Sequence, residues 1–240
     1  MHPERRQRGD RHQEEGHPEV AIMNTRRDSG FTLIELLVVM AIITTLVGLG
    51  IWGIPKMIGR GEKGAVENFL LQLHTAIDSY ATSPRNGDFP PTKLDGDSFP
   101  GVGQRRNDEN LGIESVVLCL TRRGTKSRFE HEDIPWPDAL DNLDNDKTQL
   151  ALSSIGETRD LWEIYDPWGT AIVYFHHRDY AAVDGLGLGR ATTEEQKTVR
   201  CKPWKNAKTK GWYRRDGFQL ISAGPDLKFN TDDDITNFQR

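Results

Sequence analysis

The chain has 240 residues, of which 28% are charged and 36% hydrophobic, and its formal net charge is −5 at pH 7. This composition argues against a protein with several membrane spans. The basic residues are scattered among acids, so nucleic acid is not an expected partner. The two cysteines, Cys119 and Cys201, could pair in an oxidising compartment or stay reduced in the core.

The first predicted element is an apolar segment at residues 36–55, which contains no charged side chain. At the helical rise of about 1.5 Å per residue it would extend roughly 30 Å, which is enough to cross a bilayer. Glu35 stands at its start, and a carboxylate in such a helix costs at least about 2.5 kcal/mol unless it finds a partner. Cleavage before Phe31 would create an amino group four residues earlier, on the same helix face or free to meet Glu35 of a neighbouring helix.

The sequence Gly-Phe-Thr-Leu-Ile-Glu at residues 30–35 resembles the cleavage and methylation motif of type IV pilins and type II secretion pseudopilins. The resemblance implies that a prepilin peptidase cuts between Gly30 and Phe31 and that Phe31 becomes N-methylated. It also implies that Glu35 pairs with the N-terminus of a neighbouring subunit. The alternative is an ordinary signal anchor that happens to contain a glutamate.

By the same resemblance, residues 1–30 form a leader that is removed, and translation from Met23 would give a leader closer to the short, basic type of the family. Basic residues flank both ends of the apolar segment, so charge alone leaves the orientation open. The resemblance implies a single-pass protein of the inner membrane with a cytoplasmic N-terminus. Residues 31–55 would form the membrane and filament-core helix, and residues 56–240 an extracytoplasmic domain.

Beyond the apolar segment, hydrophobic residues recur at helical spacing, at Val66, Phe69, Leu70, Leu73, Ile77 and Tyr80. This stripe predicts that one long helix continues to about Ala81 and covers something apolar. The expected fold is α+β and type IV pilin-like. In that fold a long N-terminal helix, membrane-spanning in its first half, packs on a small C-terminal antiparallel sheet.

Two insertions are expected in the exported domain, near residues 84–160 and 178–216. The first contains an apolar run at 111–120 that suits a short packed helix, followed by an acidic run at 141–146. The acidic run lacks the glycine and the distal glutamate of an EF-hand loop, so we interpret it as a solvated surface insertion, with metal binding as the alternative. The second is longer than the family pattern, and it could alter the filament surface or contact a partner.

Two segments rich in β-branched and aromatic residues, 171–175 and 217–222, predict strands. An Asp-Pro-Trp-Gly turn at 166–169 precedes the first, and Ser-Ala-Gly-Pro-Asp at 222–226 ends the second. This arrangement resembles the major pseudopilin of type II secretion systems.

The final loop gathers side-chain oxygens within nine residues, at Asp226, Asn230, Asp232, Asp233 and Asp234. Calcium binds six to eight such hard oxygens. The loop resembles the calcium-binding C-terminal loop of major pseudopilins, which implies calcium ligands at Asp226, Asp232, Asp233 and Asp234. Lys228 could compete with the ion, and the alternative is a set of solvated acids that repel only weakly.

No nucleophile motif, zinc spacing or phosphate-binding loop stands in a suitable context, so no enzyme is expected. The expected function is that of a structural subunit of a type II secretion pseudopilus. Its partners would be other pseudopilins, prepilin peptidase, the inner-membrane assembly platform and the lipid bilayer. The alternatives are a type IV pilus or minor pilin subunit, and a monomeric membrane-anchored binding module that does not need Glu35.

Overall fold

The computed structural model describes residues 31–96, 99–103, 108–122, 139–153, 155 and 158–239, without the side chains of 48–60. The chain divides into two compact units, Met1–Gly50 and Ile51–Arg240. The predicted leader and Gly30 lie outside the described residues, so their interpretation stays a prediction.

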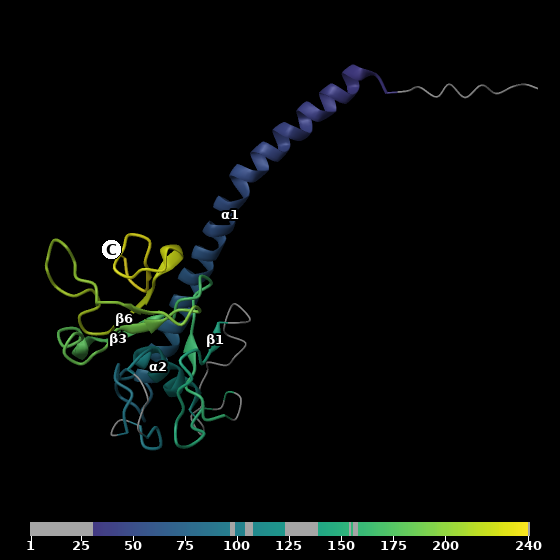
Figure 1. Ribbon diagram of the computed structural model, residues 1–240. Coiled ribbons are helices and arrows are strands. Elements are labelled where there is room, and N and C mark those ends of the chain that lie inside the picture. The colour runs from purple at the N-terminus through teal and green to yellow at the C-terminus, as the bar shows by residue number, and fades with distance from the viewer. Residues whose placement is uncertain are drawn as a thin grey trace, which may run out of the picture. The chain divides into compact units, whose positions relative to one another are not determined.

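The described chain is α+β, as predicted, with two α-helices and several short antiparallel strands (Figure 1). The helices are α1 (Leu33–Ala81) and α2 (Leu111–Thr121). The strands are β1 (Leu140–Asp141), β2 (Glu163–Ile164), β3 (Val173–His176), β4 (Arg190–Thr192), β5 (Thr198–Arg200), β6 (Phe218–Ser222) and β7 (Ile235–Thr236). Short 3-10 helices follow β3 at His177–Asp179 and β6 at Gly224–Asp226.

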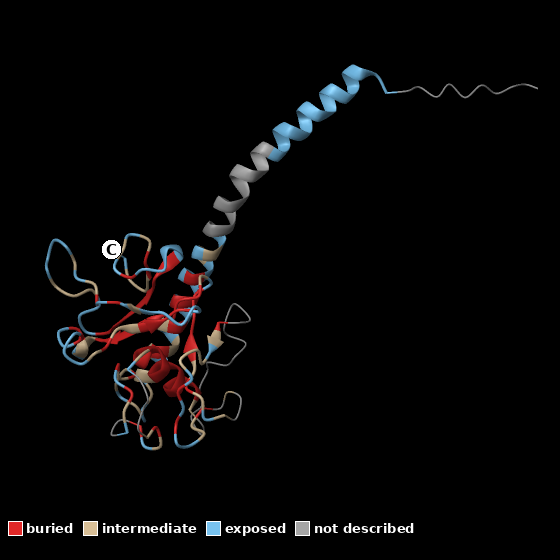
Figure 2. Ribbon diagram, viewed as in Figure 1, coloured by how far each residue is buried: buried red, intermediate tan, exposed pale blue. Residues whose placement is uncertain are grey.

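The C-terminal part of α1 uses its hydrophobic stripe as predicted. Val66, Phe69, Leu70, Leu73 and Ile77 are at most 1% exposed and join one core cluster with side chains of α2 and of the sheet. Helical spacing places these residues on one face, because i, i+3, i+4 and i+7 positions lie above one another. The helix therefore covers one face of the sheet (Figure 2).

The central sheet has three antiparallel strands in the order β3-β6-β7. Val173 of β3 pairs with Ile221 of β6, and Ser222 of β6 pairs with Ile235 of the edge strand β7. Alternate side chains enter different clusters: Tyr174 packs with the α1 stripe, and Phe175 packs in a second core. Both faces of β3 and β6 are consequently buried, which is why apolar residues stand at consecutive positions in these strands and not only at every second one.

The segment 178–216 covers the second face of the sheet. Its apolar residues Val183, Leu188 and Ala191 are buried in the same cluster as Phe175. The amide of Gln219 on β6 holds the segment by accepting from the backbone N–H of Trp204 at 2.7 Å and donating to its carbonyl oxygen at 3.0 Å. The sequence predicted this segment as an insertion, and the structure shows that it completes the core.

Helix α2 lies directly against β3. A Cβ atom built on Gly112 would stand 2.2 Å from the backbone oxygen of Tyr174, so glycine permits this approach. Cys119 of α2 and Cys201 of the 178–216 segment are both buried and both free thiols. The structure therefore contains no disulfide between them, and both cysteines pack as small apolar side chains.

Candidate assembly and metal sites

The N-terminus of α1 is closed by reciprocal hydrogen bonds between Thr32 and Glu35. The backbone N–H and the hydroxyl of Thr32 both donate to Glu35 Oε2 at 2.8 Å, and the N–H of Glu35 donates back to the Thr32 hydroxyl at 3.3 Å. This is a capping box, in which Ser or Thr at the N-cap and Glu three residues later satisfy each other's orphan donors. In the described chain, Glu35 therefore caps its own helix.

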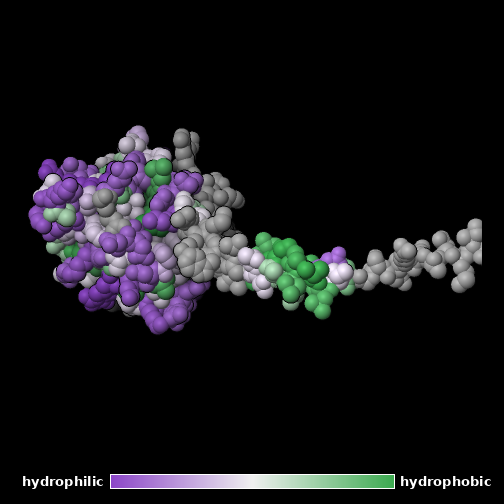
Figure 3. Space-filling view, turned by 90° about the horizontal axis from the view of Figure 1, so that it is seen from above, coloured by the Kyte–Doolittle hydropathy of each residue, from purple (hydrophilic) through white to green (hydrophobic). Residues whose placement is uncertain are grey.

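Hydrophobic side chains gather around the first turns of α1. Phe31 and Leu33 are 81% and 82% exposed, and the large apolar residues that follow, up to Val47, are also exposed (Figure 3). An apolar surface of this kind marks contact with lipid or with another protein. In the part of the chain that the structure describes, none of the helices combines the length and apolarity required to cross a bilayer.

The Asp-Pro-Trp-Gly turn and the end of β6 are joined through the carboxylate of Asp166, which is 3% exposed. Its Oδ1 accepts from the N–H groups of Trp168 at 3.1 Å and Thr170 at 3.0 Å. Its Oδ2 accepts from the hydroxyl of Ser222 at 2.7 Å. Burial raises the pKa of Asp166 to about 6, although these hydrogen bonds oppose the rise. The two sequence signals that resemble a major pseudopilin therefore contact each other.

Asp234 is the internal anchor of the C-terminal loop. Its Oδ2 accepts from the indole N–H of Trp204 and from the backbone N–H of Asn230, both at 2.9 Å. The side chain of Asn230 in turn bonds the backbone of Lys202 through its oxygen at 2.9 Å and its amide nitrogen at 2.8 Å. These bonds fix the loop to the 178–216 segment.

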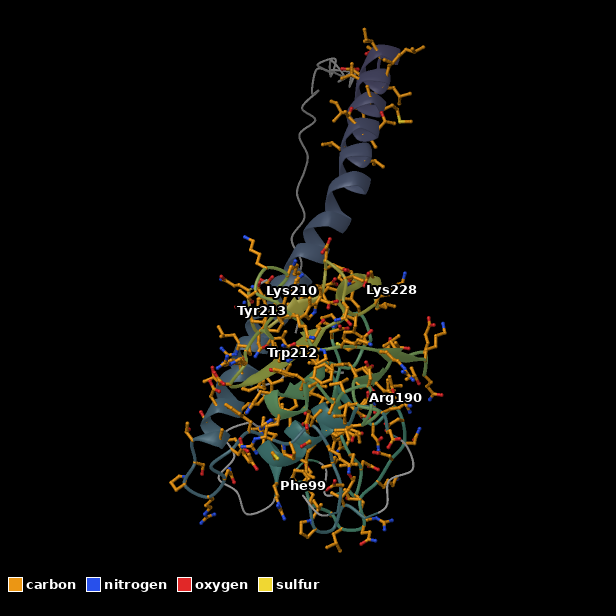
Figure 4. All side chains as sticks on the ribbon, turned by 90° about the vertical axis from the view of Figure 1, so that its left-hand side faces the viewer. Phe99, Arg190, Lys210, Trp212, Tyr213 and Lys228 are labelled. Carbon is orange, nitrogen blue, oxygen red and sulfur yellow. The ribbon has the colours of Figure 1, made fainter. Side chains whose placement is uncertain are left out.

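The other predicted calcium ligands occupy different environments. Asp233 is half-buried, and its carboxylate accepts from the Thr231 hydroxyl at 2.6 Å and from the backbone N–H of Asp226 at 3.2 Å. Partial burial opposes its ionisation, but these donors outweigh burial and hold the pKa of Asp233 below its ordinary value. Asp226 and Asp232 are exposed, as is Lys228, which lies on the outside of the same loop (Figure 4). The structure thus ties Asp233 and Asp234 inward and leaves Asp226 and Asp232 at the surface.

A second acidic cluster, which the sequence did not predict, lies inside the domain. Carboxylate oxygens of Glu114 on α2, Glu163 on β2 and Asp144 after β1 lie within 4.8 Å of one another, and this group could hold a metal ion. Two unit charges 4.8 Å apart repel by about 3.5 kcal/mol at an effective dielectric constant of about 20. Burial, followed by the charges of Glu114 and Asp144, raises the pKa of Glu163 well above its ordinary value. The cluster therefore requires a proton or a cation.

The interpretation of residues 141–146 as a solvated insertion is wrong for its last residue. Asp146 is only 1% exposed, and the loop closes on itself because Asn142 Nδ2 donates to the Asp146 carbonyl at 2.7 Å. The alternation Asn142-x-Asp144-x-Asp146 was the available sequence signal. The distal acids come from other elements, so a search along the chain for an EF-hand glutamate could not find them.

Comparison with known proteins agrees with the sequence motifs. Residues 25–51 match the prokaryotic N-terminal methylation motif. The type II secretion system core protein G of Escherichia coli (strain K12) is 25% identical over 218 residues, which cover 89% of this chain and 93% of that protein. No solved structure matches the chain. The chain therefore carries a prepilin-type N-terminus and is similar, over most of its length, to a core protein of type II secretion.

Proposed function

We propose that the chain is a structural subunit of a type II secretion pseudopilus. The single observation that carries this proposal is the exposed apolar segment that runs from Phe31 into the first turns of α1, with Glu35 at its edge, and that coincides with the methylation motif. The similarity to a type II secretion core protein extends to the rest of the chain. Both findings favour a structural role over a catalytic one.

In this function, residues 1–30 are the leader that prepilin peptidase removes, and residues 31–55 anchor the subunit in the inner membrane before assembly. Residues 56–240 then lie outside the cytoplasm. The apolar side chains at the start of α1 leave lipid for contacts with the same helices of neighbouring subunits, on the secretion assembly platform. The apolar side chains are shielded from water both in lipid and between helices, so the hydrophobic effect contributes little to this transfer. The free energy of assembly therefore depends on helix packing and on polar pairing.

Glu35 is the polar group of that pairing. Both hydrogen bonds from Thr32 reach the same carboxylate oxygen, Oε2, so helix capping still allows the other oxygen to accept from a cation. The methylated amino group of Phe31 on a neighbouring subunit is that cation in the proposed filament. A charged pair in an apolar surrounding costs far less than an unpaired carboxylate, so assembly is coupled to correct cleavage.

We further propose that calcium binds the C-terminal loop through Asp226, Asp232, Asp233 and Asp234. The support is the density of carboxylates there and the depressed pKa of Asp233, which keeps its carboxylate ionised. A bound ion would draw the exposed acids Asp226 and Asp232 toward the anchored part of the loop. The edge strand β7, which follows immediately, would then be held more firmly on the sheet.

The function is tested first by the intact mass and N-terminal sequence of the protein extracted from membranes of its native host. A start at N-methyl-Phe31 is expected, and an uncut leader would contradict the proposal.

The second test compares Glu35→Ala with Glu67→Ala, which removes an exposed acid from the described, non-apolar part of the same helix. We expect Glu35→Ala to be cleaved but to yield no cross-linked filaments and no secretion, while Glu67→Ala behaves as the wild type. Normal filaments from Glu35→Ala would contradict the assigned role of Glu35 in assembly. A wild type that forms no filaments, with a function that Glu35→Ala leaves unchanged, would favour a signal anchor or a monomeric anchored binding module. If filaments form but extend from the cell surface, the chain is a pilus or minor pilin subunit.

A further inference from the structure

The internal acidic cluster, here defined as Glu114, Asp144 and Glu163, brings together three elements that are distant in sequence. Glu114 comes from α2, Glu163 from β2, and Asp144 from the loop after β1. Glu114 and Glu163 are both fully buried, whereas Asp144 is half-buried and closes the cluster toward the surface. The site is separate from the C-terminal loop that the proposed function assigns to calcium.

A second observation points to a ligand at this place. Glu163 is fully buried, and its Oε2 receives no hydrogen bond from any described residue. Its other oxygen, Oε1, accepts from Asn110 Nδ2 at 3.0 Å. A buried carboxylate oxygen without a donor is rare, because the protein does not replace the water that it loses.

Asn110 cannot neutralise the cluster. Its Nδ2 lies 3.0 Å from Glu163, 3.3 Å from Asp144 and 3.2 Å from the hydroxyl oxygen of Thr192. An amide group has two hydrogens for these three acceptors, and it carries no charge. Asn110 is itself fixed, since its backbone N–H donates to the Arg190 carbonyl and its Oδ1 accepts from the Thr192 N–H, both at 2.9 Å.

The electrostatic surroundings of Glu163 are negative. The charges that act on it are those of Glu114, Asp144 and Asp146. The amine of Lys147, which follows Asp146 in the chain, lies 3.1 Å from Asp160 and is exposed. A small multivalent cation would satisfy the bare oxygen of Glu163 and cancel most of the repulsion in one step.

We propose that Glu114, Asp144 and Glu163 bind one calcium ion inside the domain. All donors are hard oxygens, without nitrogen or sulfur, which selects calcium or magnesium over zinc or copper. Ligands from three separate elements give an irregular set of oxygens, which calcium tolerates better than the strictly octahedral magnesium ion. The ion would fasten the loop at 142–146 to α2 and β2, so that the first insertion becomes part of the core.

The test measures calcium bound per chain by equilibrium dialysis of the full chain in detergent, with calcium alone as the probe. Glu163→Gln keeps the shape of the side chain and removes its charge. We expect it to bind one calcium ion fewer than the wild type, whether or not the C-terminal loop also binds one. The control Asp216→Asn, at a side chain that is 89% exposed, should bind as many ions as the wild type.

Asp144→Asn provides a second variant if Glu163→Gln fails to fold, because Asp144 is half-buried and lies on a loop. It should lose the same ion. If both folded variants bind as many calcium ions as the wild type, the proposal is overturned and the cluster is held together by protons. Displacement of the ion by magnesium at equal concentration would overturn the assignment to calcium.

Discussion

Gly112 is the position at which a single methyl group should separate two core elements. A Cβ atom there would stand 2.2 Å from the carbonyl oxygen and 3.1 Å from the carbonyl carbon of Tyr174. Both are backbone atoms of β3, so the clash cannot be relieved by a rotamer change. Helix α2 would have to withdraw by roughly 1 Å, and a gap of that size forfeits a quarter to a half of the dispersion energy of each contact.

We therefore expect Gly112→Ala to destabilise the domain by about 2 kcal/mol. Overpacking costs about 1 to 3 kcal/mol or more, and the higher helix propensity of alanine returns at most about 1 kcal/mol. For a domain of this size that corresponds to a melting temperature lower by about 4 to 8 °C. The assay is thermal unfolding of the full chain in detergent, followed by near-ultraviolet circular dichroism.

The matched control is Gly64→Ala, which places the same methyl group on helix α1, where nothing lies within 4 Å of it. Helix propensity alone then acts, and this variant should melt at or above the wild-type temperature. The two substitutions thus have opposite expected signs. A Gly112→Ala variant that melts as high as Gly64→Ala would refute the close approach of α2 to β3.

Two further predictions concern acidic side chains. Burial raises the pKa of Asp166 from 3.8 to about 6, so its contribution to stability is fully present below pH 4 and is lost as the pH rises through about 6. The variant Asp166→Asn cannot ionise at this position, so its melting temperature minus that of the wild type should increase from pH 4.5 to pH 7. A difference that stays constant across this range would contradict the assigned environment. Asp233→Asn should weaken calcium binding at the C-terminal loop. The wild type would gain about 2.7 kcal/mol at a calcium concentration 100 times Kd, and the variant should gain less. Equal calcium-dependent shifts in the two proteins would argue against Asp233 as a ligand.

Several elements could be predicted because their signals are local. The stripe from Val66 to Ile77 indicated the helix and the face that it buries, and both are confirmed. The apolar run at 111–120 is helix α2, and the segments at 171–175 and 217–222 contain β3 and β6. Each of these patterns repeats within a few residues, so the sequence alone suffices to read it.

The candidate sites divide in the same way. The Gly-Phe-Thr-Leu-Ile-Glu motif is contiguous, and the comparison with known proteins agrees with it. The internal acidic cluster is not contiguous: Glu114 and Glu163 are single acids in two separate apolar segments, and no metal-ligand spacing links them in the sequence. Their convergence depends on where α2 packs.

By itself, the sequence determined the apolar start of the long helix, its amphipathic continuation, the prepilin-type motif and the main strands. Only the tertiary structure decided that the 178–216 segment closes the second face of the sheet, that Asp166 joins Ser222, and that Glu163 meets Glu114 and Asp144. The reason is physical. Periodicity reports which face of an element avoids water, whereas the partner of a buried polar group is set by packing between elements that the chain brings together from far apart.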